Sequence, residues 1–230
     1  MLSAFAPAAA TQPSSQPRRR IVDGIFLTHV HIGHYAGLMQ LGREVLGTHA
    51  VPVYAMPRMQ RFLESNGPWD QLVKLNNIDL RPLAADTPVP LTGGLTVTPF
   101  LVPHRDEYSE TVGYLIKGPR RRVLFIPDID KWERWNRRLE DDLADVDVAY
   151  LDATFYDATE LPGRDLSEIP HPFIVETMQR LQSLPPTERA KVHFIHLNHT
   201  NPALQPNSAA RKAIDQQGFH IAEVGERIEL

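Results

Sequence analysis

The sequence predicts one domain of the mixed α+β class, with a β-rich centre and helices outside it. Short apolar runs of strand length occur along the chain together with amphipathic segments of helical length. Residues that can bind a metal ion repeatedly stand directly after the apolar runs. Strand ends and the loops that follow them commonly build a functional site at one edge of a sheet. The length of 230 residues suits a single domain of this kind.

Apolar periodicity and turn residues locate the elements in order. We expect strands at 21–28, 51–55, 95–102, 111–117, 122–126, 146–151 and 191–197, and a last strand or hairpin within 219–230. We expect helices at 33–47, 59–64, 132–143, 173–184 and 208–217, several of which stop at Gly or Pro. Gly118-Pro119 should form the turn of a hairpin. Residues 1–20 are predicted to be a disordered leader, and 21–230 the domain.

Composition narrows the classes of function. The hydrophobic fraction of 42% allows a sizeable core, and the formal net charge of -4 gives no reason to expect nucleic acid as a partner. The absence of cysteine excludes disulfides, thiolate zinc sites and cysteine nucleophiles. No apolar run approaches the roughly 18 residues that span a bilayer, and the start of the chain is a poor signal peptide. We therefore expect no membrane partner and a cytoplasmic location.

The most informative segment is THVHIGHYAGL, residues 28–38, at the junction of an apolar strand and an amphipathic segment. It holds His29, His31 and His34 in the pattern H-x-H-x-x-H. Two histidines two residues apart in an extended segment can point the same way, because side chains alternate with period two. Neutral imidazole is a common ligand for zinc and iron. We therefore expect the chain to fold around a metal ion.

Four further candidate residues come just after later apolar runs or at their ends: His104, Asp128, Asp152 and His196. A catalytic zinc keeps about three protein ligands and one open position for water, whose pKa it lowers to roughly 7. Two ions about 4 Å apart can share one carboxylate. The spacing of these residues along the chain suits such a centre.

HVHIGH, followed by His104, Asp128 and His196, resembles the metallo-β-lactamase fold superfamily, whose hallmark is H-x-H-x-D-H, then a histidine, a bridging aspartate and a last histidine. The resemblance covers about residues 21–230 and implies an αββα sandwich. It also implies that three residues, His29, His31 and His104, bind a first metal. Asp128 would bridge, and His34 and His196 would bind a second metal.

The C-terminal third is similar to the pyrroloquinoline quinone biosynthesis protein B family, a branch of that superfamily. The similarity lies in the segment HLNHTNP (196–202), the pair Asn207-Ser208, the strand-end segment Asp152-Ala153-Thr154 and the ending Ile228-Glu229-Leu230. Members of that family often have degraded metal motifs, and this chain keeps more histidines than they usually do.

Two departures from the superfamily pattern matter. Gly33 stands where the superfamily has aspartate, so a second metal would lose a carboxylate ligand. We therefore expect one tight zinc site and a second that is weak or empty, with iron or manganese as the alternative metals. Only about 20 residues precede the histidine motif, so the sandwich should be short of its first N-terminal strands, through truncation or a smaller first sheet. A homodimer is one way to cover the free edge of such a sheet.

Several residues have a structural alternative. His104 could belong to a surface cluster of ion pairs, and Asp128 to a plain turn. His199 could transfer a proton or contact substrate, or shape its loop. Asp152 could assist proton transfer, orient a ligand from behind, or cap a loop through Thr154. The histidines without neighbouring candidates are predicted to be structural: His49, His171, His193 and His220.

Two functions of different classes follow from these residues. The first is a metal-dependent hydrolase of an ester, amide or phosphodiester bond in a small-molecule or peptide-derived substrate, with His199 and Asp152 as catalytic residues. The second is an oxidative or accessory role in quinone cofactor biosynthesis with non-haem iron, which also suits histidines and one carboxylate. A non-catalytic protein that binds a partner on a decayed site is a third alternative.

Overall fold

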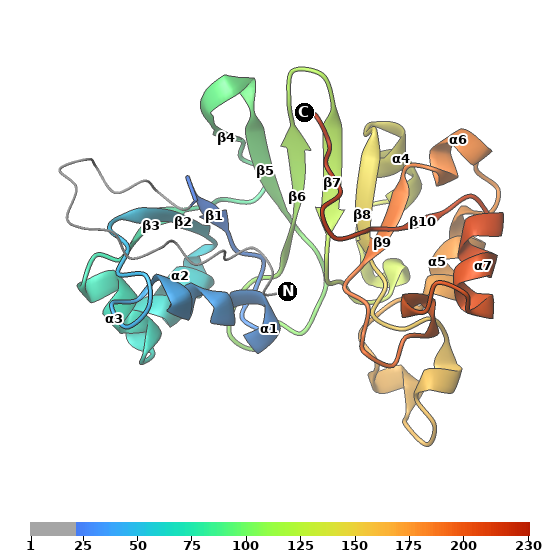
Figure 1. The fold of residues 1–230 in the computed structure, drawn as a ribbon, viewed down its shortest axis with the longest axis horizontal. Helices are drawn as coiled ribbons and strands as arrows, with labels where there is room; N and C mark the ends of the chain where they lie inside the picture. The colour runs from blue at the N-terminus through green and yellow to red at the C-terminus, as the bar shows by residue number, and fades with distance from the viewer. Residues whose placement is uncertain (1–21) are drawn as a thin grey trace.

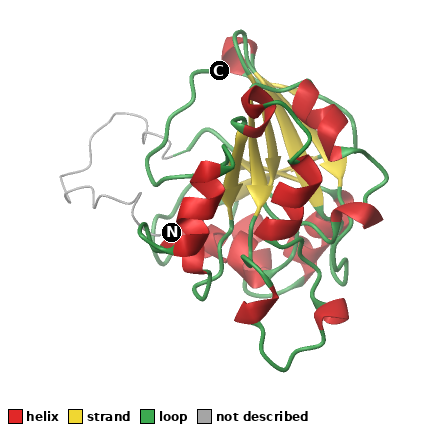
Figure 2. Ribbon diagram, turned by 90° about the vertical axis from the view of Figure 1, so that its right-hand side faces the viewer, coloured by secondary structure: helices red, strands yellow, loops and turns green. Residues whose placement is uncertain are grey.

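The computed structural model describes residues 22–230, so the predicted leader lies outside the described residues. Within this range the strands form a three-stranded and a seven-stranded sheet that face one another, with helices on the outer face of each (Figure 1). Turned by 90°, the molecule shows helices lying across the outer face of the large sheet (Figure 2). The layers therefore run helix, sheet, sheet, helix, which confirms the predicted αββα sandwich.

The small sheet is parallel throughout and carries the first three histidines behind its edge strand. Its strands are β1 (Ile25–Phe26), β2 (Val51–Ala55) and β3 (Ile78–Pro82), and its helical segments are α1 (Ile32–Tyr35), η1 (Ala36–Leu41), α2 (Pro57–Ser65) and α3 (Trp69–Lys74). The predicted strand at 21–28 pairs over only two residues, because the chain leaves the small sheet there. The carbonyl of Thr28 already accepts a hydrogen bond from Val112 of the large sheet, at 3.1 Å.

The predicted helix at 33–47 is instead one α-helical turn followed by a 3-10 helix, α1 and η1. Gly33, Gly37 and Gly42 fall in this segment, and each glycine lowers helix stability by roughly 1 kcal/mol relative to alanine. The helix α3 and the strand β3 were not predicted, because the polar stretch around them hides their short apolar faces.

The large sheet follows chain order from one edge to the other. Its strands are β4 (Val89–Pro90), β5 (Thr96–Leu101), β6 (Val112–Lys117), β7 (Arg122–Ile126), β8 (Val148–Asp152), β9 (Val192–Ile195) and β10 (His220–Ile221). Pairing is antiparallel from β4 to β7 and parallel from β7 to β10. The remaining helical segments are η2 (Thr92–Gly94), η3 (Trp132–Arg134), α4 (Leu139–Ala144), η4 (Ala158–Glu160), η5 (Leu166–Glu168), α5 (Ile174–Leu181), α6 (Pro186–Arg189), η6 (Pro202–Leu204) and α7 (Ala209–Gln216).

The C-terminal end differs from the predicted strand or hairpin. β10 spans two residues and pairs in parallel with β9. The segment 222–230 then turns back across the sheet towards the β6–β7 turn (Figure 1). Leu230 packs so closely on Gly118 that a β-carbon at this glycine would clash with it. Gly118 therefore seats the end of the chain as well as forming the predicted turn.

Three apolar clusters hold the layers together. One joins the large sheet to α4, α5 and α7, and one joins the small sheet to α1, α2 and α3. The third lies between the sheets and contains Met56, Leu83, Val97, Val112 and Tyr114. Among residues 22–230, none of the helices has the length and apolar character that crossing a membrane requires.

Strand direction explains where polar residues gather. β5 and β7 are both antiparallel to β6, and β8 and β9 are parallel to β7. These four strands therefore end at the same edge of the large sheet. The end of β1 reaches that edge too, through the hydrogen bond of Thr28 to the first residue of β6. The residues predicted at strand ends are thus brought to one place.

Candidate metal centre

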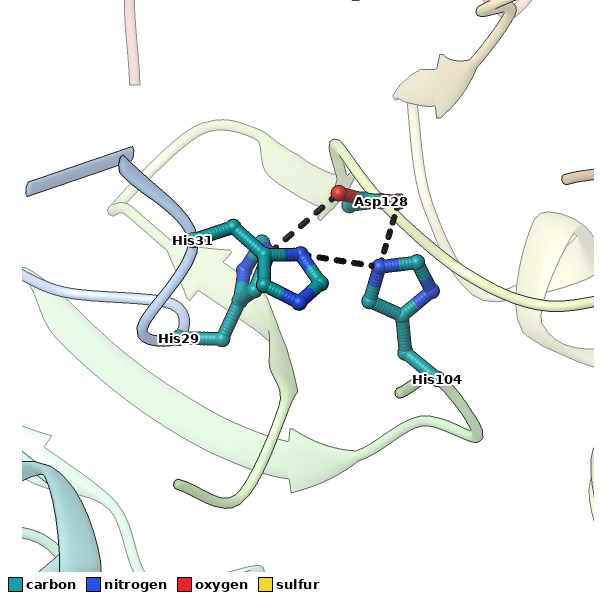
Figure 3. A group of neighbouring side chains, drawn as sticks. All are labelled: His29, His31, His104 and Asp128. Carbon is teal, nitrogen blue, oxygen red and sulfur yellow. Dashed lines mark hydrogen bonds and ion pairs between the residues drawn. The ribbon is translucent and has the colours of Figure 1, made fainter. Parts of the chain in front are cut away.

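Three imidazoles and one carboxylate converge at this edge (Figure 3). The Nε2 of His29 lies 2.9 Å from Nδ1 of His31, and the Nε2 of His104 lies 3.3 Å from the same atom. The carboxylate of Asp128 lies 3.3 Å from Nε2 of His29 and 3.2 Å from Nε2 of His104. Ligands on a tetrahedral zinc with bonds of about 2.05 Å are about 3.3 Å apart. The four side chains therefore have the spacing of a zinc cage.

The bonding state of these atoms also fits a cation. Asp128 Oδ1 is buried, and no donor among the described residues meets it in hydrogen-bond geometry, although two imidazole nitrogens lie 3.2 Å away. Burial lowers the pKa of His29 to about 4, although the contact with Asp128 works against the shift. Burial also lowers the pKa of His31. Both imidazoles are therefore neutral near pH 7 and can present a lone pair.

Asp128 stays ionised in spite of its burial. Burial alone would raise the pKa of this carboxyl, but the surrounding imidazoles of His104, His171, His29 and His34 outweigh it and hold the pKa well below its usual range. Asp128 thus supplies the negative charge that a divalent cation requires.

His34 and His196 lie on the other side of Asp128. Their Nε2 atoms are 3.1 Å apart, and Nε2 of His34 is 3.4 Å from Asp128 Oδ2. His196 has a φ of 63°, in the left-handed region that few residues other than glycine adopt. Its Nδ1 lies 2.8 Å from the hydroxyl of Thr154, which fixes the ring. These residues form the second half of the predicted centre, and Asp128 lies between the halves.

A third imidazole, that of His171, was not predicted here. Its Nδ1 is 2.9 Å from Asp152 Oδ2 and 3.2 Å from Asp128 Oδ1, so it joins a group of four with Asp128, Asp152 and His196. Burial opposes protonation, but the contacts with the two carboxylates raise the pKa of His171 to about 10. The structural role expected for His171 is therefore replaced by a place in the centre.

Asp152 is fully buried at the end of β8 and is held from several sides. Its carboxylate accepts hydrogen bonds from the amide and hydroxyl of Thr154, at 2.9 and 2.7 Å, and from the amide of Ile129 at 3.1 Å. Burial would raise the pKa of Asp152, but His171 and His196 lower it overall. Asp152 thus orients two imidazoles and also fixes the turn that begins at Thr154.

His199, the other predicted catalytic residue, lies outside both groups. It is exposed, and its Nδ1 lies 3.2 Å from the side-chain oxygen of its neighbour Asn198. The loop that carries it is anchored by the buried Asn201, which donates to the carbonyl of Ala153 at 2.9 Å. His199 can therefore approach a bound molecule only from the rim.

The loop after β5 adds an outer partner to the centre. The Nε2 of His31 lies 3.3 Å from the Glu107 carboxylate, so the ring has a carboxylate on the side away from the cage. The Arg58 guanidinium at the start of α2 donates to the carbonyls of Asp106 and Glu107, at 2.7 and 3.2 Å. In return, Glu110 accepts from the amide of Arg58 at 3.0 Å. This exchange joins the small layer to the loop of the large one.

A sandwich of this topology with histidines and one shared aspartate at its strand ends defines a metallo-β-lactamase fold protein. The family model described as "Beta-lactamase superfamily domain" matches residues 1–197, and the chain belongs to that superfamily. Within it, the chain is similar to coenzyme PQQ synthesis protein B, or PqqB. It is 27% identical to that protein of Xanthomonas axonopodis pv. citri (strain 306), over 96% of this chain and 77% of the relative.

Solved structures agree on the fold. The Zn2+-bound PqqB of Methylobacterium extorquens superposes with a TM-score of 0.77 at 21% identity, over 95% of this chain and 77% of that one. A diphosphatase of the PhnP family superposes with a TM-score of 0.58 at 19% identity, over 91% of this chain and 72% of that one. The resemblance to a PqqB-like branch, predicted from the sequence, is thereby confirmed.

Proposed function

We propose that this protein is a metal-dependent hydrolase whose principal ion, zinc in the first place, is held by His29, His31, His104 and Asp128. The spacing of their four ligand atoms, close to the edges of a zinc tetrahedron, is the observation that carries the proposal. Zinc bound there would lower the pKa of a coordinated water to about 7 and polarise a carbonyl or phosphoryl oxygen.

The protein's own residues would handle the proton. Asp152 and Asp128 hold Nδ1 of His171, so Nε2 of this ring is the atom that can give a proton to a leaving group. Asp152 acts through that imidazole, as an orienting carboxylate. His199 remains a candidate for contact with a substrate at the rim.

A second ion would be bound more weakly. His34, His196 and Asp128 offer ligand atoms 3.1 and 3.4 Å apart, but Gly33 provides no carboxylate. Iron or manganese could take either position, since imidazole and carboxylate oxygen suit them too. We retain one tight and one weak site as the proposal.

For the substrate we propose a small molecule or a peptide-derived compound with an ester, amide or phosphodiester bond. The likeness to a diphosphatase supports hydrolysis, and the likeness to PQQ synthesis proteins supports a peptide-derived or quinone precursor. A cytoplasmic location and a homodimer stay predictions, which cell fractionation and sedimentation would check.

A second function is favoured by one specific observation, the glycine at position 33. A missing carboxylate weakens the two-ion hydrolytic centre more than it weakens binding of one ion. Non-haem iron with open positions could then support an oxidative step in quinone cofactor synthesis, the process for which the curated relatives are named.

Elemental analysis of protein purified without added metal tests both proposals. Near one zinc per chain, with hydrolysis of nitrophenyl esters or phosphodiesters that is lost in a His29→Ala, His31→Ala double variant, is expected for the hydrolase. Iron with oxygen consumption and no hydrolysis would favour the oxidative role. Absence of bound metal after reconstitution with zinc, iron or manganese would overturn both and leave a non-catalytic binding protein.

A further inference from the structure

A second group of titratable side chains lies on the last strands, outside both groups of the metal centre. Tyr150, His193 and His220 are in register across β8, β9 and β10. Residues in register on neighbouring strands point to the same face of the sheet. The three side chains therefore form one row, in which the ring centroids of His193 and His220 are 5.1 Å apart.

This separation matches the paired imidazoles of the metal centre. There, ring centroids lie 4.4 Å apart for His29 and His31 and 5.3 Å apart for His29 and His104. The tilt between the rings of His193 and His220 is 46°, close to the 39° between His34 and His196. Two imidazoles bound to one ion through nitrogens at about 2.05 Å have this spacing.

A carboxylate completes the arrangement. Glu226, in the segment that turns back after β10, has Oε1 3.0 Å from Nδ1 of His193. A histidine that gives its Nδ1–H to a carboxylate keeps the Nε2 lone pair for a metal, and the carboxylate raises its basicity as a ligand. Burial and the neighbouring His220 lower the pKa of His193, against the effect of Glu226, so the ring is neutral near pH 7.

The surroundings suit a cation better than an anion. A cavity of about 420 Å³ is lined by both histidines, Glu226, Glu223 and Arg211. Arg211 is the cationic side chain of this lining, and its charge is balanced by Glu223 at 3.5 Å and by Asp215 at 3.6 Å. Glu226 therefore remains to compensate an added positive charge.

We propose that His193 and His220 form a peripheral site for a divalent transition-metal ion of the zinc, nickel or copper class, with Glu226 as its outer partner. The ion would join the edge strand β10 to β9 and fix the segment 222–230, which carries Glu226. Water would complete the coordination, because the site lies at the surface. This site is independent of the proposed hydrolytic centre.

Zinc binding to the untagged full chain tests the site, with equilibrium dialysis against Zn2+ followed by elemental analysis. We expect His220→Gln to bind one equivalent less than the unchanged chain and Glu226→Gln to weaken that equivalent by about 10–100-fold. His199→Gln, at another exposed histidine, is the matched control and should bind the full amount. Equal zinc content in His220→Gln and the unchanged chain would overturn the site.

A second variant separates this inference from the proposed function. His31→Ala with His104→Ala removes two ligands of the principal centre and should leave the equivalent at His193 and His220 in place. If that double variant also loses this equivalent while circular dichroism shows it folded, the peripheral site does not exist. Retention of all zinc in the double variant would instead contradict the principal centre alone.

Discussion

The Nε2 of His104 and Oδ1 of Asp128 lie 3.2 Å apart, although their strands, β5 and β7, are separated in the sheet by β6. The contact spans the width of a strand because both residues lie in loops beyond the same sheet edge. Both side chains are almost completely buried, at 0% and 3% exposure. Neither can exchange its partner for water, so a change in one is felt by the other.

Replacement of His104 should therefore abolish tight metal binding. We expect His104→Ala to weaken zinc binding by more than the 10–100-fold that outer partners typically contribute, because a ligand is removed directly. Competition with a chromophoric chelator measures the affinity. His199→Ala should retain the affinity of the unchanged chain, and an unchanged affinity in His104→Ala would contradict its role as a ligand.

Gly33→Asp should strengthen the second metal position. A β-carbon at this glycine has no heavy atom within 4 Å, and its φ is not positive, so the larger side chain can be accommodated. We expect zinc content in the principal centre to rise from about one towards two equivalents, counted in a His220→Gln background. Gly33→Ala should show no rise, since it fills the same space without a carboxylate. Equal stoichiometry in both variants would mean that position 33 does not face the ion.

The metal-free protein should lose stability as the pH rises above about 6.5. The two carboxylates raise the pKa of His171 to about 10 in the folded state, whereas burial opposes the shift and the unfolded value is 6.5. The stabilisation is complete below pH 6.5 and is lost as the pH rises through 10, at up to about 1.4 kcal/mol per pH unit for one proton. Urea unfolding of the apoprotein measures this.

His171→Gln is the matched variant for the pH experiment. It should show a flatter dependence between pH 6.5 and 10, because the titrating imidazole is gone. Saturation with zinc should also reduce the slope in the unchanged chain, since the ion competes with the proton for Asp128. Parallel curves for the variant and the unchanged chain would exclude His171 as the source.

Arg58→Met should weaken metal binding although residue 58 contacts no ligand. The guanidinium holds the backbone of Asp106 and Glu107, which follow His104 in the loop. We expect about a 10-fold weaker zinc affinity, in the range seen for outer partners. Arg61→Met, one turn further along α2 and exposed, serves as the control. An affinity unchanged in Arg58→Met would show that the loop holds its position without this clamp.

Much of the fold could be predicted from the chain because periodicity is local. The strands at 51–55 and 122–126 were predicted with the bounds that the structure has, and the hairpin at Gly118 was predicted from its turn residues. The short segments were harder. The predicted helix at 132–143 divides into η3 and α4, because Trp132 and Trp135 turn inwards and take the chain out of the helical path.

The candidate site was predictable where its residues follow strands. His29, His104, Asp128 and His196 all stand at strand ends, so direction and pairing bring them together. His171 stands in a loop before α5, where no periodic pattern points to it, and only the packing of that loop on Asp152 brings it in. Its one local signal is the pair of prolines on either side, Pro170 and Pro172, which favour an extended backbone.

The ligands of the metal centre are spread from residue 29 to residue 196, and this has a consequence for biosynthesis. On the ribosome, the first three histidines emerge long before Asp128, the carboxylate that both groups share. The emerging chain therefore offers a metal ion only isolated imidazoles until the second sheet has paired. Insertion of the ion is a late event, and the metal supply of the cell meets a nearly finished protein.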